Sequence, residues 1–252
     1  MTIRKMKNIF YILLLTTQVF FAQNGFEEGN ALYKAGKYEQ AIDAYAGVLK
    51  TNQHSSELYF NLGNCYYKLN KVAPAIYSYE KALVLSPNDR EVLNNLKFAQ
   101  KRTIDEVKVI PKVGFGKLLR DFTGIYHYNT WAWIAVVSAI SFLLVFLGYY
   151  FSETTVIKRV SFFVMFALIF VILIVISSAI FEKTHYDNEK PAIVFDEITE
   201  IRSEPQKGSS VIFMLHEGAK VYVEEKVTGW KKVQLTDGTE GWIASDAIRE
   251  VK

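Results

Sequence analysis

Two long stretches of the chain contain no charged residue. Residues 131–151 and 160–181 hold almost only apolar and aromatic side chains. A helix rises about 1.5 Å per residue, so each stretch is long enough to cross the roughly 30 Å apolar core of a bilayer. The first stretch has tryptophans near one end and tyrosines near the other, as is typical of membrane interfaces. The pattern predicts two transmembrane helices joined by a short loop.

A shorter apolar stretch lies at the N-terminus. It follows a cationic segment and ends at Ala22. This order is typical of a secretory signal peptide, so we expect residues 1–22 to be one, with cleavage after Ala22. Phe20 departs from the small residue that is usual near a cleavage site, and an uncleaved anchor helix is the alternative.

The charges around the two predicted spans indicate their orientation. The connecting loop, residues 152–159, carries Lys158 and Arg159, and cationic loops favour the cytoplasmic side. The predicted signal peptide independently sends the following region outward, and two spans return the chain to that side. We therefore expect a multi-pass protein of the inner (cytoplasmic) membrane, with both flanking domains in the periplasm.

The segment before the first span is amphipathic. Phe115, Leu118, Leu119 and Phe122 recur at helical spacing, while charged residues occupy the opposite face. This predicts a short helix in the membrane interface, within a linker at 103–127. A helix packed on the preceding domain is the alternative.

The region after the predicted signal peptide repeats itself at a shift of 34 residues. This period resembles that of tetratricopeptide repeats, which are pairs of helices. We expect repeats at 22–55 and 56–89 and a capping helix at 90–102, together an all-α domain over 23–102. The matching pairs are Gly29-Asn30 with Gly63-Asn64, Tyr33-Lys34 with Tyr67-Lys68, and Ala41-Ile42 with Ala75-Ile76.

The resemblance implies a concave groove that binds a peptide or helix of a partner protein. The first helix of each repeat would line this groove. The candidate peptide-binding residues are Asn30, Tyr33, Lys34, Phe60, Asn61, Asn64, Tyr67 and Lys68.

Two of these asparagines stand where carboxylate-clamp repeats also carry asparagine. They are Asn30 and Asn61, but the basic residues of that clamp are replaced by Phe26, Glu91 and Asn95. We therefore do not expect this groove to recognise an acidic C-terminus. The alternative is that the asparagines are ordinary repeat consensus.

The C-terminal region, 188–252, alternates short β-type runs with glycine turns. This predicts a small all-β barrel. The run from Ile201 to Pro205, with Gly229-Trp230 and Gly241-Trp242, resembles bacterial SH3 domains. The resemblance implies a ligand surface at Trp230 and Trp242; burial of Trp242 in the barrel core is the alternative. The expected strands are 193–195, 200–202, 211–215, 220–225, 231–235 and 241–243.

Composition narrows the classes of function. The net charge of +3 is dispersed, which argues against nucleic acid as a partner. One cysteine and four scattered histidines indicate no metal site, and we expect no cofactor. No spacing typical of a catalytic site is visible, so we expect no enzyme.

The order of these parts resembles the BatE-type proteins of the Bacteroides aerotolerance cluster. That resemblance implies partners with von Willebrand factor A-type domains and a role in oxygen tolerance or envelope stress. The sequence thus predicts a membrane-anchored extracytoplasmic scaffold that binds proteins through both domains. The alternative is a structural tether whose SH3 domain binds peptidoglycan.

Overall fold

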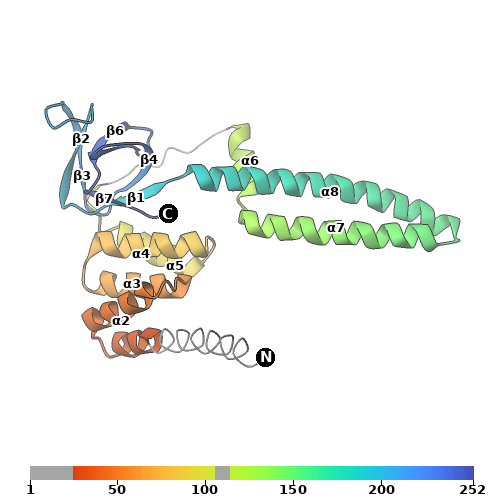
Figure 1. The fold of residues 1–252 in the computed structure, drawn as a ribbon, viewed down its shortest axis with the longest axis horizontal. Helices are drawn as coiled ribbons and strands as arrows, with labels where there is room; N and C mark the ends of the chain where they lie inside the picture. The colour runs from red at the N-terminus through yellow and green to blue at the C-terminus, as the bar shows by residue number, and fades with distance from the viewer. Residues whose placement is uncertain (1–24, 106–113) are drawn as a thin grey trace, which may run out of the picture. The chain divides into compact units, whose positions relative to one another are not determined.

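The computed structural model describes residues 25–105 and 114–252. The chain divides into two compact units, of which the first combines Met1–Val109 with Lys190–Lys252 and the second is Ile110–Glu189. The first unit contains helices α2 to α5 and the β-sheet, and the second contains helices α6 to α8 (Figure 1). The predicted signal peptide at 1–22 lies outside the described residues.

The helical part of the first unit is a stack of antiparallel helices. Consecutive helices contact each other, as the repeat pattern predicts. Ser55 and Asp89 cap α3 and α5, because their side-chain oxygens accept hydrogen bonds from backbone N–H groups of the first turn. The helices are residues 25–34, α2 (Tyr38–Lys50), α3 (Ser56–Lys68), α4 (Val72–Leu85) and α5 (Arg90–Gln100).

Glycine lets the two helices of each repeat approach closely. A Cβ atom added at Gly29 would lie within 2.4 Å of the Tyr45 ring. One repeat later, a Cβ atom at Gly63 would lie within 2.7 Å of the Tyr79 ring. Both tyrosines are almost completely buried. The recurrence of this contact confirms the helical repeat that the sequence period predicts.

The C-terminal part of the first unit is a seven-stranded antiparallel sheet with strand order β3-β2-β6-β5-β4-β1-β7. Gly218, Gly229 and Gly238 have φ of 85°, 80° and 87°, which explains the predicted glycine turns. The strands are β1 (Pro191–Val194), β2 (Ile198–Arg202), β3 (Val211–His216), β4 (Lys220–Val227), β5 (Trp230–Gln234), β6 (Glu240–Ala244) and β7 (Ile248–Glu250). The short strand β7 was not predicted.

The sheet packs directly on the helical stack. Ile193 and Val251 of the β-domain belong to the same buried cluster as Ile76 and Tyr79 of α4. At its edge, Tyr77 meets Phe195 with ring centroids 5.6 Å apart. The helical and β-domains therefore form one body with a shared apolar core, although the sequence contains no motif for this packing.

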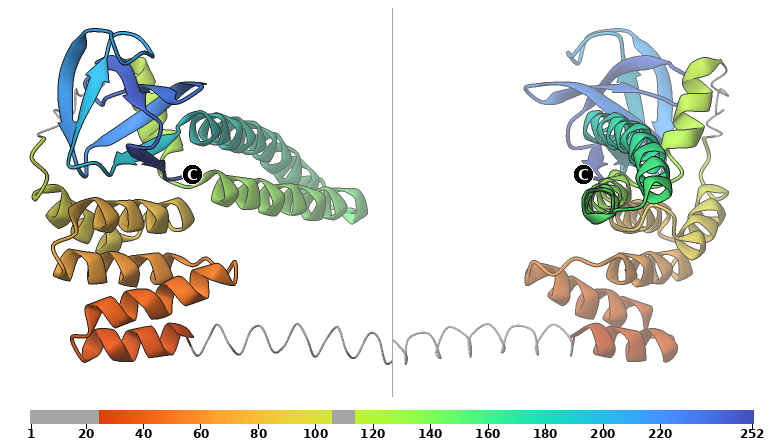
Figure 2. Two further views of the ribbon diagram at one scale, coloured as in Figure 1. Left: turned by 60° about the vertical axis from the view of Figure 1, so that its left-hand side comes forward. Right: turned by 90° about the vertical axis from the view of Figure 1, so that its right-hand side faces the viewer.

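The second unit is a helical hairpin with one additional short helix. Helix α7 (Tyr128–Phe151) and helix α8 (Thr155–Asn188) lie side by side (Figure 2). Both are longer than the predicted charge-free stretches. The predicted loop at 152–159 is therefore wrong in its extent, because only residues 152–154 connect the helices and Lys158 and Arg159 lie near the start of α8. Small polar residues are buried along the hairpin, which is typical of close contacts between membrane helices. These residues are Ser138, Ser161 and Ser178.

The hairpin exposes apolar surface almost everywhere. The most apolar windows of α7 and α8 have mean hydropathies of 2.2 and 3.1, and only 6% of each window is buried. A core helix of a water-soluble protein would be mostly buried, and exposing this much apolar surface to water is unfavourable. The two helices therefore indicate membrane association.

The amphipathic segment forms α6 (Phe115–Thr123), which belongs to the second unit and contacts α8. The indole N–H of Trp131, on α7, donates a hydrogen bond of 2.7 Å to the backbone oxygen of Thr123. Phe122 lies against the same indole. These contacts attach α6 to the hairpin, and its position in a membrane interface stays a prediction.

Candidate functional site

The predicted groove asparagines hold neighbouring helices together. The side-chain oxygen of Asn30 accepts hydrogen bonds from the Tyr45 hydroxyl at 2.7 Å and from the Asn61 amide at 2.9 Å. One repeat later, Asn64 accepts from Tyr79 and Asn95 at the same two distances. Both acceptor positions of each oxygen are therefore used within the repeat, and a role for these asparagines in binding a peptide stays a prediction.

The tyrosines of this network remain hydrogen-bond donors at ordinary pH. Burial is the main reason why the pKa values of Tyr45 and Tyr79 lie above that of an exposed phenol. Desolvation disfavours the phenolate, so each hydroxyl keeps the proton that it donates to asparagine. The donors of this network therefore keep their protons over the pH range in which proteins are usually studied.

The other groove candidates are more accessible. Lys34 and Lys68 are exposed, and Tyr33 and Phe60 are partly buried. The guanidinium of Arg102 lies 3.7 Å from the centre of the Tyr67 ring and donates to the Tyr67 backbone oxygen. The structure thus places the eight residues on successive first helices, with a cation covering one face of Tyr67.

The two tryptophans of the β-domain are both half-buried. Trp242 pairs with Lys232 in the sheet, and its neighbours Gly241 and Ile243 are buried on the opposite face. Trp242 therefore lies outside the buried cluster of the β-domain, and its role in binding a ligand stays a prediction. Because paired residues share a face, Trp230 and Trp242 lie on the same outer face of β5 and β6.

Two polar contacts join the helical and β-domains. Both carboxylate oxygens of Glu80, which is almost buried, lie 2.8 Å from the Lys220 ammonium. Asp105 accepts from the backbone N–H of His216 at 2.6 Å and also pairs with the His216 ring at 2.9 Å. Such directional contacts fix the orientation of the two domains within this unit.

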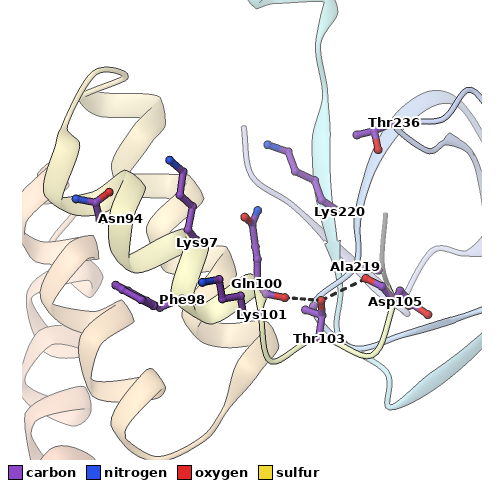
Figure 3. Close-up of a pocket in the computed structure, with 11 residues that line it drawn as sticks. Asn94, Lys97, Phe98, Gln100, Lys101, Thr103, Asp105, Ala219, Lys220 and Thr236 are labelled. Atoms are coloured by element: carbon purple, nitrogen blue, oxygen red, sulfur yellow. Dashed lines mark hydrogen bonds between the residues drawn. The ribbon is translucent and has the colours of Figure 1, made fainter. Parts of the chain in front are cut away.

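Beside these contacts the junction opens into a cleft of about 990 Å³, which we call the junction cleft. Figure 3 shows α5 forming one wall and the start of β4 another. At its base the Thr103 hydroxyl donates to the backbone oxygen of Gln100 at 2.7 Å. The lining residues are Asn94, Lys97, Phe98, Gln100, Lys101, Thr103, Asp105, Gly218, Ala219, Lys220 and Thr236.

Sequence reasoning missed the junction cleft. One signal was present, because Lys97 stands 34 residues after Gly63, at the position where both repeats carry glycine. In the two repeats, glycine at this position lets the second helix pack closely on the first. A lysine at the same position of α5 prevents such close packing by a further helix. The other wall comes from the β-domain, more than a hundred residues later in the chain. Local sequence patterns do not indicate contacts between segments that lie so far apart.

Comparison with known families agrees with this architecture. Residues 26–90 match the tetratricopeptide repeat family, and residues 199–249 match the bacterial SH3 domain family. No curated protein matches the chain. The protein thus combines a helical repeat region, two apolar helices and an SH3-like domain. Both matched families are typically non-catalytic interaction modules, so the matches indicate protein binding and include no enzyme family.

Proposed function

We propose that the protein is a membrane-anchored scaffold that binds partner proteins through its repeat groove and its SH3-like domain. The observation that carries this proposal is the packing of two interaction modules into one unit. A shared core gives both modules a fixed relative orientation, so a partner can engage them together. This distinguishes the protein from a chain with two independent modules on flexible linkers.

The connection to the apolar hairpin is short. Helix α8 ends at Asn188 and strand β1 begins at Pro191. A brief tether to a membrane hairpin keeps the binding unit close to the bilayer and raises its effective concentration towards partners in the same membrane. Membrane proteins are therefore the favoured partners.

The finer proposal concerns compartment and partners. The cations Lys158 and Arg159 near the start of α8, together with the predicted signal peptide, support an inner-membrane protein with both interaction modules in the periplasm. The resemblance to BatE-type proteins supports membrane partners with von Willebrand factor A-type domains and an aerotolerance or envelope-stress complex.

A crosslinked pull-down of tagged full-length protein from native membranes tests the scaffold proposal. We expect specific recovery of membrane proteins, and weaker recovery with the groove variant Lys34→Glu/Lys68→Glu. The matched control is Lys37→Glu/Lys71→Glu, which reverses two exposed charges also one repeat apart. If no specific protein is recovered, the scaffold proposal is wrong. If the groove variant recovers the same proteins in equal amounts, the groove does not bind these partners.

The half-buried tryptophans Trp230 and Trp242 on one outer face of the sheet favour one second candidate, a tether that binds peptidoglycan. Aromatic faces bind sugar and peptide surfaces with little loss of side-chain entropy. The detergent-solubilised full chain should then sediment with purified sacculi, and Trp230→Ala/Trp242→Ala should abolish sedimentation. A full chain that stays in the supernatant rules out the tether.

A further inference from the structure

Helix α5 ends the repeat array with an incomplete unit. Lys97 corresponds to Gly63, which packs against the second helix of its repeat, and Phe98 corresponds to Asn64, which bonds to the next first helix. At α5 the chain leaves the array after Gln100, and the SH3-like domain contributes the opposite wall. The face of α5 that would carry the next helices therefore borders the junction cleft.

The size of the junction cleft suits a ligand. Its volume of about 990 Å³ lies at the upper end of the range for binding sites, which is roughly 300–1,000 Å³. The Phe98 side chain is 54% exposed and offers an apolar surface within it. Thr236 also lines the cleft, and its hydroxyl oxygen is buried without a hydrogen-bond partner among the described residues.

The charge of the junction cleft is positive. Lys97 on α5 and Lys101 at its C-cap are exposed and form no ion pair with any described residue, and the Lys101 ammonium lies 5.6 Å from the centre of the Phe98 ring. The carboxylate of Asp105 is engaged by His216, and Lys220 already neutralises Glu80. Two uncompensated ammonium groups beside an apolar ring therefore attract an anionic ligand with an apolar part.

We propose that the junction cleft binds an acidic, extended segment of a partner protein, with an apolar side chain of that segment against Phe98. This rests on the proposed scaffold function and names the chemistry of its partner. A helix is disfavoured as occupant, because close helix packing in this array requires glycine where Lys97 stands. The site also differs from the concave groove, whose clamp positions lack basic residues.

The test uses the full chain in nanodiscs of zwitterionic lipid and a fluorescein-labelled polyglutamate peptide with one central phenylalanine. Fluorescence anisotropy should show binding that weakens as salt is raised, because surface ion pairs are screened. Lys97→Glu/Lys101→Glu should raise Kd by about tenfold or more, since two attractive contacts become repulsive. Phe98→Ala should weaken this peptide but leave binding of plain polyglutamate unchanged.

The matched control is Lys37→Glu/Lys71→Glu, which reverses two exposed charges outside both the cleft and the groove and should bind the peptide normally. Circular dichroism and thermal melting establish that each variant is folded. The proposal is overturned if polyserine binds as well as polyglutamate, or if the cleft variant and the Lys37→Glu/Lys71→Glu control lose binding equally. Recovery of membrane partners without peptide binding refutes the cleft proposal alone, whereas peptide binding without any recovered partner supports the cleft and refutes the scaffold.

Discussion

Cys65 illustrates how burial controls the chemistry of a single side chain. It is completely buried against the first repeat, and this desolvation raises the pKa of its thiol to about 11. At pH 8 the thiolate fraction falls from roughly a tenth for a pKa near 9 to about a thousandth. We expect the folded chain to react with iodoacetamide far more slowly than a free thiol, as mass spectrometry would show.

An exposed thiol on the same fold provides the control. Lys34→Cys in a Cys65→Ala background should react at the rate of a free thiol, because Lys34 is exposed. Urea should make Cys65 equally reactive in the native sequence. Rapid labelling of Cys65 in the folded chain would contradict its complete burial.

Close helix packing can be tested with two glycines of the array. Gly63 lies under the Tyr79 ring, so the Cβ atom of Gly63→Ala would lie 2.7 Å from ring carbon atoms. We expect this variant to lose about 1–3 kcal/mol of stability. Gly47→Ala on α2 meets no atom within 4 Å and should instead gain about 0.5–1 kcal/mol. Thermal unfolding followed by circular dichroism measures both variants, and equal melting temperatures would contradict the packing.

Most elements could be predicted because their signals are local. The repeat period, the charge-free stretches and the glycine turns each report on neighbouring residues, and the corresponding helices and strands are present. Strand β7 (Ile248–Glu250) was not predicted, because it is short and pairs with β1, which is distant in the sequence. Helix α8 extends past the apolar stretch to Asn188, supported by an ion pair of 2.8 Å between Lys183 and Asp187.

The arrangement of the first unit could not be predicted in the same way. Helix α4 buries residues on more than one face, and its apolar run from Val72 to Tyr77 is the only hint that something besides the repeats covers it. Sequence does not identify that cover as the β-domain. The asparagines could be placed on the first helices, but whether they bind a ligand or one another depends on distances between repeats.

The ion pair between Glu80 and Lys220 offers a test of the coupled domains. Glu80→Lys would place two ammonium groups together at an almost buried position, and we expect a loss of about 3 kcal/mol. The helical and β-domains should then melt in separate transitions, where the native chain shows a single one. Scanning calorimetry of the full chain in detergent measures this difference.

Reversal of the pair provides the matched control for that experiment. Glu80→Lys/Lys220→Glu restores opposite charges and should recover most of the lost stability. Lys207→Glu, at an exposed position of the β-domain, should leave the melting curve unchanged. If the double variant melts like Glu80→Lys alone, the pair does not couple the domains.

The proposed orientation in the membrane makes a prediction for the whole chain. In a Cys65→Ala background, Glu153→Cys places a thiol in the loop between α7 and α8, and Asp237→Cys places one in an exposed turn of the β-domain. The end of the hairpin that carries Lys158 and Arg159 should face the cytoplasm, so a membrane-impermeant maleimide should label Asp237→Cys in intact spheroplasts. Glu153→Cys should react only after permeabilisation. The reverse pattern would place both interaction modules in the cytoplasm and would exclude partners and cell-wall ligands on the outer side.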